Sequence, residues 1–118
     1  NLQTRHKQWY LGKSLDGFTP MGPCIVTADE IGDEQALDIS CTVNGQLRQN
    51  SNTRYMIQTV CGAIAELSEG MTLAAGTIIA TGTPAGVGMG MKPPTFLQHG
   101  DKIVCSIEKI GLLENTID

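Results

Sequence analysis

The sequence has few aromatic residues, and its apolar residues never form a long uninterrupted run. Aromatic side chains make up 4% of the 118 residues, although 41% of the residues are hydrophobic. The most apolar stretch, residues 71–80, contains threonine and glycine and is far shorter than the roughly 20 residues of a membrane-spanning helix. Residues 1–8 are polar and lack the apolar segment of a secretory signal peptide. We therefore expect no membrane-spanning segment and a cytoplasmic location.

Basic residues are also scarce. The chain has 8 Lys and Arg residues against 12 Asp and Glu residues, and its net charge is -4. A basic excess is typical of nucleic-acid-binding domains, so this balance argues against a nucleic-acid partner. The exception is the N-terminal region, where Arg5, Lys7 and Lys13 occur before the first acidic residue. A local positive field of this kind suits a small anionic ligand.

Zinc-binding cysteine motifs are absent, because no two cysteines are separated by only two residues. The two histidines, His6 and His99, are far apart in the sequence, and we expect both to be polar surface residues. The four cysteines are Cys24, Cys41, Cys61 and Cys105. We expect buried free thiols in a reducing cytosol, with a pair of disulfides as the alternative.

Four acidic residues, Asp29, Glu30, Asp33 and Glu34, lie close together in the sequence. Such a group could hold a metal ion. The surrounding segment lacks apolar framing, however, so we expect a solvated turn.

Alternating apolar residues predict β-strands over residues 37–43, 103–107 and 113–117. Between the first of these and its expected return near Leu47, the pair Asn44 and Gly45 is a strong hairpin signal. A further short strand, buried on both faces, is predicted at residues 77–81. Together these elements indicate one α+β domain that is mostly β.

One helix is predicted over residues 59–69. Val60, Ile64 and Leu67 recur at helical spacing, Thr59 suits the N-cap, and Gly70 suits the end.

Lys13 is the first candidate functional residue. Trp9 and Tyr10 precede it, and aromatic neighbours would partly desolvate its ammonium group and favour an electrostatic or proton-transfer role. A surface lysine without a special role is the alternative reading of the local composition.

A segment with four glycines, residues 82–90 and hereafter the glycine loop, follows the strand predicted at residues 77–81. Its backbone N–H groups, with the hydroxyl of Thr83, could bind a carboxylate or phosphate. The segment is not a P-loop, because no Gly-Lys-Ser/Thr ending is present. A wide turn without a ligand is an equally good reading.

Taken together, several motifs resemble the central and C-terminal sequence of the fumarylacetoacetate hydrolase family, in the family's order. They are LQ (2–3), KQWYLGKS (7–14), PMGP (20–23), VNGQLRQ (43–49), SNT (51–53), MI (56–57), LSEGMTL (67–73), ATGTPAGVG (80–88), PP (93–94), FL (96–97) and GD (100–101). Within the family, the chain is similar to members of the 2-hydroxyhepta-2,4-diene-1,7-dioate isomerase type and the fumarylacetoacetate hydrolase domain-containing type. The resemblance implies the mixed β-roll of the family's C-terminal domain, with one short helix.

The resemblance also implies an activity: a divalent-metal-dependent enzyme of small 2-oxo dicarboxylic acids or acylpyruvates. Family members act as hydrolases, lyases or isomerases, through C–C hydrolysis, decarboxylation or keto–enol isomerisation. Mg²⁺ or Mn²⁺ holds the substrate in that family, as a Lewis acid. The resemblance further implies two partners: a small anionic substrate and a second copy of the chain in a homodimer.

Residue roles follow from the same resemblance. Lys13 matches the family's active-site lysine, and Gln3 matches a glutamine that hydrogen-bonds the substrate carbonyl or a water molecule. Thr83 matches the threonine of the Gly-Thr-Pro turn, where Gly82 and Pro84 complete the substrate-binding segment. We therefore expect Lys13 and Thr83 to hold the two ends of a small acid.

The chain departs from the family at its metal site. The family's ligands, a Glu-x-Glu pair and an aspartate, precede the position that matches Gln3. Here Asn1 stands where the aspartate would be, and no Glu-x-Glu triplet occurs. We therefore expect residues 1–118 to be a partial domain, the C-terminal portion of the catalytic domain, with no metal ligand and no activity by itself. The alternative is a non-catalytic module whose glycine loop binds an anion or a partner.

Overall fold

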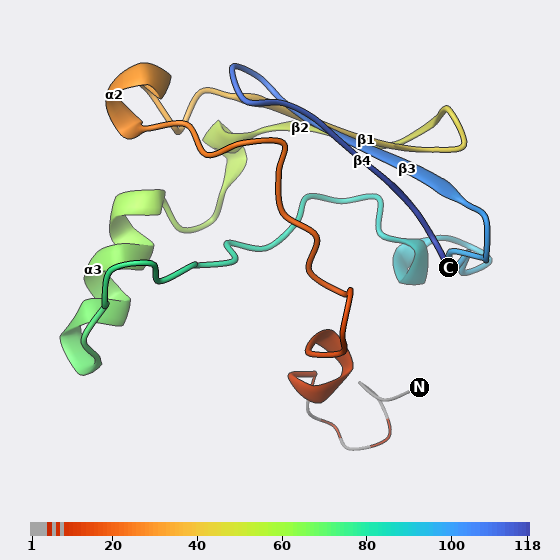
Figure 1. The fold of residues 1–118 in the computed structure, drawn as a ribbon, viewed down its shortest axis with the longest axis horizontal. Helices are drawn as coiled ribbons and strands as arrows, with labels where there is room; N and C mark the ends of the chain where they lie inside the picture. Colours follow the sequence, from red (N-terminus) through yellow and green to blue (C-terminus); the bar gives the residue numbers. More distant parts are fainter. Residues whose placement is uncertain (1–4, 6, 8) are drawn as a thin grey trace.

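The computed structural model describes residues 5, 7 and 9–118, and its main feature is one antiparallel sheet of four strands (Figure 1). The strands are β1 (Asp38–Val43), β2 (Gln46–Asn52), β3 (Lys102–Ile107) and β4 (Gly111–Thr116), and their order in the sheet is β2-β1-β3-β4. The prediction of a mostly β, α+β fold is confirmed. No helix in the described part of the chain is long and apolar enough to cross a membrane.

Both hairpins of the sheet depend on residues that tolerate a positive φ. Asn44 and Gly45 connect β1 to β2 with φ of 51° and 77°, as the sequence predicts. Lys109, with φ of 64°, lies in the turn between β3 and β4. Asn44 also ties the hairpin to β3, because its N–H donates to the Lys102 carbonyl at 2.8 Å.

The pairing of β1 with β2 contains a β-bulge. Cys41 lies opposite Gln49, but the next residue, Thr42, lies opposite Leu47. Arg48 is therefore the extra residue on β2, without a direct partner on β1. A bulge locally changes which side of a strand its side chains face, and this one determines the geometry described below.

The one long helix is α3 (Val60–Gly70), within one residue of its predicted limits. Thr59 caps it as expected, since its hydroxyl oxygen accepts the N–H of Gly62 at 3.0 Å. The helix lies beside the sheet rather than across its face (Figure 1). A second helix, α2 (Ala28–Ile31), has only four residues. Three short 3₁₀ helices complete the structure: η1 (Leu11–Lys13), η2 (Thr53–Tyr55) and η3 (Gly88–Gly90).

The described residues form a thin core. The two buried hydrophobic side chains are Ile31 and Leu37, exposed by 6% and 5%. They lie on either side of Asp33 and Glu34, so the prediction of a segment without apolar framing is wrong. The acidic residues Asp29 and Glu30 are exposed on α2, as a solvated surface requires.

The strand predicted at residues 77–81 is wrong. These residues follow a turn at Gly76 and belong to no strand, and Ile78 is 67% exposed. A strand is stabilised by hydrogen bonds to a neighbouring strand, and no strand of the described residues pairs with this segment. Two adjacent isoleucines were therefore insufficient evidence for it.

The molecule is also more extended than an ordinary domain. Its Cα radius of gyration is 15.6 Å, whereas a compact domain of this length is expected at about 13.5 Å. Large apolar side chains are exposed along the chain, including Phe18, Ile25 and Ile57. Apolar surface of this extent is typical of a face that packs against another part of a protein.

Candidate functional site

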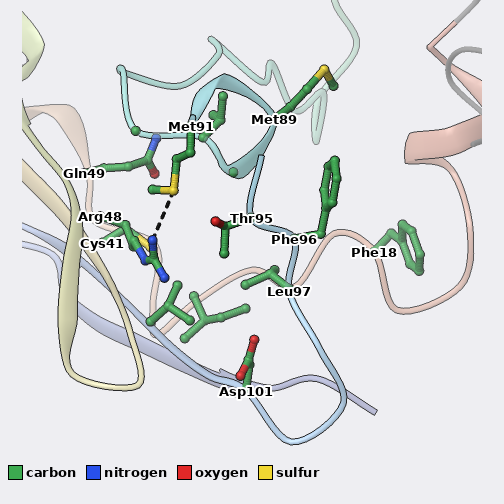
Figure 2. Close-up of a pocket in the computed structure, with 15 residues that line it drawn as sticks. Phe18, Cys41, Arg48, Gln49, Met89, Met91, Thr95, Phe96, Leu97 and Asp101 are labelled. Atoms are coloured by element: carbon green, nitrogen blue, oxygen red, sulfur yellow. Dashed lines mark hydrogen bonds between the residues drawn. The ribbon is translucent and has the colours of Figure 1, made fainter. Parts of the chain in front are cut away.

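The bulge in β2 places two consecutive polar side chains beside one cavity. Side chains normally alternate between the faces of a strand, yet both Arg48 and Gln49 line a cavity of about 560 Å³. Cys41, opposite Gln49 on β1, lines it as well. Figure 2 shows these side chains at one end of the cavity and Phe18 with Phe96 at the other. The sheet thus supplies polar groups, and the loop segments supply much of the apolar wall.

Gln49 connects the sheet to the glycine loop. Its Nε2 donates to the Thr83 hydroxyl oxygen and to the Pro84 carbonyl oxygen, both at 2.8 Å. A hydroxyl that accepts through its oxygen keeps its own proton for donation to another acceptor. Thr83 is exposed. Its hydroxyl is therefore positioned to donate to a carboxylate oxygen that arrives from outside the loop.

Two glycines allow the loop to pack closely. A Cβ atom at Gly86 would collide with the carbonyl oxygen of Arg48, the bulged residue of β2. A Cβ at Gly88 would collide with the Thr95 carbonyl oxygen. Gly86 and Gly82 also have φ of 109° and 96°, where glycine is favoured. Gly86 and Gly88 therefore serve close packing, a role that neither earlier interpretation of these glycines, an anion-binding loop or a wide turn, included.

The bulged arginine makes a second contact across the cavity. Its Nη1 donates to the Met91 sulfur at 3.1 Å, drawn as the dashed line in Figure 2. Gln49 thus holds the start of the loop at Thr83 and Pro84, and Arg48 holds Met91, directly after its end. The loop is positioned by β2 rather than by a preceding strand.

Asp101 is the acidic group of the cavity lining. Its carboxylate accepts the backbone N–H of Gln98 and the side-chain N–H of Asn44, both at 2.8 Å. The pKa of Asp101 lies below its ordinary value of 3.8. The main cause is the hydrogen bond from the Gln98 N–H, followed by the Asn44 amide and the nearby positive charge of Arg48, because all three favour the ionised carboxylate. The carboxylate is therefore ionised at neutral pH and balances the arginine.

Lys13 lies in η1, in a different part of the fold from the glycine loop (Figure 1). Its ammonium nitrogen is 5.5 Å from the centre of the Trp9 ring, a cation–π distance. The predicted aromatic neighbour is therefore present, but Lys13 remains exposed. Among the described residues, no hydrogen bond or ion pair joins Lys13 to Thr83, so their shared role stays a prediction.

The remaining predicted residues are placed only in part. Gln3 and His6 lie outside the described residues, and nothing is added to the expectations for them. His99 is exposed, as expected. All four cysteines are free thiols, as predicted, but none is fully buried: Cys24 and Cys61 are exposed, and Cys41 and Cys105 are half-buried.

The described residues do not provide a metal site. In residues 5, 7 and 9–118, no three His, Cys, Asp or Glu side chains come together as metal ligands. The cavity's one carboxylate, Asp101, is already bound by two N–H donors. This donor set does not fit a divalent cation, and no step through a metal is derived from these residues.

Sequence reasoning did not single out Gln49 and Arg48 as site residues. The strand around them, Gln46–Asn52, is almost entirely polar, but it lies at the edge of the sheet, where polar side chains are common. Its composition alone therefore gave no signal of a binding site. Their shared face could not be foreseen, since it depends on the bulge.

A family model and two relatives of known name match the chain over nearly all of its length. The family model described as "Fumarylacetoacetate (FAA) hydrolase C-terminal" matches residues 1–118. The chain is 51% identical over 117 residues to oxaloacetate tautomerase YisK of Bacillus subtilis, covering 99% of this chain and 39% of the relative. It is 50% identical over 111 residues to the mitochondrial oxaloacetate tautomerase Fahd2a of Rattus norvegicus, covering 94% and 36%.

Solved structures agree with this similarity. A fumarylacetoacetate hydrolase from Exiguobacterium antarcticum superposes with a TM-score of 0.96 at 54% identity, covering 99% of this chain and 42% of that one. The maleylpyruvate hydrolase from Sphingobium sp. SYK-6, in complex with manganese(II) and pyruvate, gives 0.80 at 43% identity, covering 89% and 37%. The chain therefore spans about two fifths of the length of these relatives.

Proposed function

The chain belongs to the fumarylacetoacetate hydrolase family, and we propose that the protein containing it interconverts the keto and enol forms of a small 2-oxo dicarboxylic acid such as oxaloacetate. Two relatives at about half identity are named as oxaloacetate tautomerases. The observation that carries the proposal is the Gln49 side chain, which holds Thr83 with its hydroxyl proton available to a carboxylate.

Thr83 binds one end of the substrate in this proposal. Its O–H donates to a carboxylate oxygen while Gln49 holds the hydroxyl oxygen in place. Gly82, with φ of 96°, and Pro84, whose carbonyl accepts from Gln49, fix the turn on either side. A preorganised donor of this kind binds an anion without reordering the loop.

Lys13 acts at the reacting end. Tautomerisation moves one proton between the carbonyl oxygen and the neighbouring carbon, and negative charge forms on the oxygen when the carbon loses its proton. The Lys13 ammonium stabilises that charge, and its contact with Trp9 orients the side chain. Gln3 is proposed to hydrogen-bond the same carbonyl, as the family resemblance implies.

A divalent cation, Mg²⁺ or Mn²⁺, is part of the proposal, and it would supply Lewis-acid stabilisation of the bound 2-oxo acid. A solved relative is described with manganese(II) and pyruvate, which supports this cofactor. The described residues offer no ligand set, so its ligands are proposed to lie in other parts of the protein.

A homodimer is proposed on the exposed apolar surface, which includes Trp9, Tyr10 and Met89. Light scattering of the whole protein tests it, and a monomeric mass would contradict it. The cytoplasmic location stays a prediction, since the names of several relatives include "mitochondrial".

Activity of the whole protein on oxaloacetate tests the proposal, followed through the ultraviolet absorbance of the enol with and without Mg²⁺. Lys13→Met should lower kcat by about 10²–10³-fold, as expected for loss of one donor to a developing oxyanion. Lys92→Met, at another exposed lysine, is the matched control and should keep wild-type kcat.

Thr83→Val keeps the side-chain shape and removes the hydroxyl. Because a hydrogen bond to a charged group contributes about 1.5–3 kcal/mol, KM should rise about 10–100-fold. Thr83→Ser should retain most of the affinity. Equal activity in Lys13→Met and wild type would refute the role of Lys13, and cleavage of acylpyruvates without tautomerisation would favour the hydrolase reaction instead.

A further inference from the structure

Two thiols face each other in the centre of the sheet. Cys41 on β1 lies directly opposite Cys105 on β3, and their sulfur atoms are 3.7 Å apart. The Cys105 thiol donates to the Cys41 sulfur, and the Cys41 thiol donates to the Thr42 carbonyl at 3.8 Å. The two side chains are half-buried on the same face of the sheet.

The backbone at this position suits a covalent bond between the sulfurs. Ladder hydrogen bonds join Glu108 to Asp38 and Asn44 to Lys102, at 2.9 and 2.8 Å. Each of these two hydrogen-bonded residue pairs lies three positions along the strands from the cysteine pair. Hydrogen-bonded pairs alternate with non-hydrogen-bonded pairs along an antiparallel ladder. The cysteines are therefore a non-hydrogen-bonded pair, with Cα atoms about 4.5 Å apart, inside the range of about 4.4–6.8 Å for disulfides.

We propose that Cys41 and Cys105 form a reversible oxidation site, which a peroxide converts into a cross-strand disulfide. One thiolate attacks a peroxide oxygen and becomes a sulfenic acid, while the other oxygen leaves as water after taking up a proton. The second cysteine then attacks the sulfenic sulfur, and the sulfur–oxygen bond breaks with release of a second water. In total the two thiols lose two electrons and two protons to the peroxide.

The other two cysteines do not have this geometry. Cys24 donates to the Ile110 carbonyl at 3.7 Å, and Cys61 contacts a Glu34 carboxylate oxygen at 3.7 Å. Both are exposed. They therefore serve as internal controls for reactivity that depends on exposure alone.

The surroundings of Cys41 set the conditions under which the site reacts. Burial, together with the neighbouring Cys105, raises the pKa of the Cys41 thiol to about 11. Because the thiolate is the nucleophile, oxidation should be slow at neutral pH, require excess peroxide and become faster at pH 9.

The site also adjoins the candidate substrate site, and this consequence rests on the proposed function. Gln49, which holds Thr83, lies directly opposite Cys41 on β2. A disulfide shortens the distance between the two sulfurs from 3.7 Å to about 2.05 Å, so the Cys41 side chain, which lines the cavity beside Gln49, must turn toward β3. We expect oxidation to raise KM severalfold with little change in kcat, reversed by dithiothreitol.

Peptide mapping of the whole protein tests the oxidation site. The wild-type protein is treated with hydrogen peroxide at pH 7 and pH 9, blocked with N-ethylmaleimide in denaturant and digested without reduction. The expected result is a pair of linked peptides containing Cys41 and Cys105, two hydrogens lighter than their sum, with more at pH 9. Cys24→Ser and Cys61→Ser should retain the link, and Cys41→Ser should abolish it.

Recovery of Cys41 and Cys105 as maleimide adducts, or separately as sulfinic acids, would overturn the proposal. The mapping uses the wild-type protein, so the result does not depend on whether Cys41→Ser folds. A disulfide that forms without any change in KM would overturn the coupling to Gln49. Because the mapping needs no substrate, failure of the proposed tautomerase activity leaves its result readable.

Discussion

The four-stranded sheet and the glycine loop are held in place by different means. The sheet is stabilised by continuous backbone pairing between neighbouring strands. The loop has no such ladder and is held by two side chains of β2 and by the close packing of Gly86 and Gly88. We therefore expect the sheet to tolerate many side-chain changes, whereas the loop depends on a few particular contacts.

Among changes to the sheet and the loop, the largest expected effect comes from breaking the close packing of the loop against β2. Gly86→Ala places a methyl group against the Arg48 carbonyl at a φ of 109°, so the loop must move away from β2. We expect kcat/KM to fall about 100-fold, in line with the cost of misplacing a binding group. Steady-state kinetics with oxaloacetate measure this change.

Gly76→Ala is the matched control for that variant. Gly76 also has a positive φ, 85°, but a Cβ there meets no atom within 4 Å. Its cost should be the backbone strain alone, seen as a lower Tm with kcat/KM close to wild type. Equal loss of activity in the two variants would show that strain, rather than contact with β2, matters.

A smaller effect is expected when the side-chain link is removed. Gln49→Leu keeps the size of the side chain but deletes both hydrogen bonds to the loop. KM should rise about tenfold, because each lost hydrogen bond contributes about 0.5–1.5 kcal/mol, and kcat should change little. Gln46→Leu, at the exposed start of the same strand, should leave KM unchanged. An unchanged KM in Gln49→Leu would show that its two hydrogen bonds to the loop do not position Thr83.

The smallest effect concerns acid stability. Because the folded protein holds the pKa of Asp101 below 3.8, its ionised form stabilises the fold at neutral pH, and this contribution is lost as the pH falls through the lowered pKa. Asp101→Asn should lower the Tm at pH 7, and by less as the pH drops below 3.8. Differential scanning fluorimetry from pH 2.5 to pH 7 measures both proteins; parallel Tm curves for Asp101→Asn and wild type would contradict the prediction.

Much of the sheet and the start of α3 could be predicted from sequence, because the signals for both are local. The positive φ needed at Asn44 and Gly45, the alternation along β3 and the cap at Thr59 each act within a few residues. The structure confirms all three. Local signals of this kind do not depend on where the rest of the chain lies.

The features that were missed depend on distant contacts. The strand at residues 77–81 failed because pairing requires a neighbour that the pattern cannot supply. Arg48 and Gln49 were missed because their shared face follows from a bulge. Lys13 and Thr83 were identified as a pair through the family resemblance, and the contact of Thr83 with Gln49 emerged only in three dimensions.

The extra residue at Arg48 limits how the length of this segment can change in evolution. Deletion of one residue between Gly45 and Asn52 would restore regular alternation and turn either the arginine or the glutamine away from the loop. Related proteins that keep both contacts must therefore keep the number of residues in β2, even where the individual amino acids differ. An alignment gap inside residues 46–52 would mark a relative that positions its glycine loop by other means.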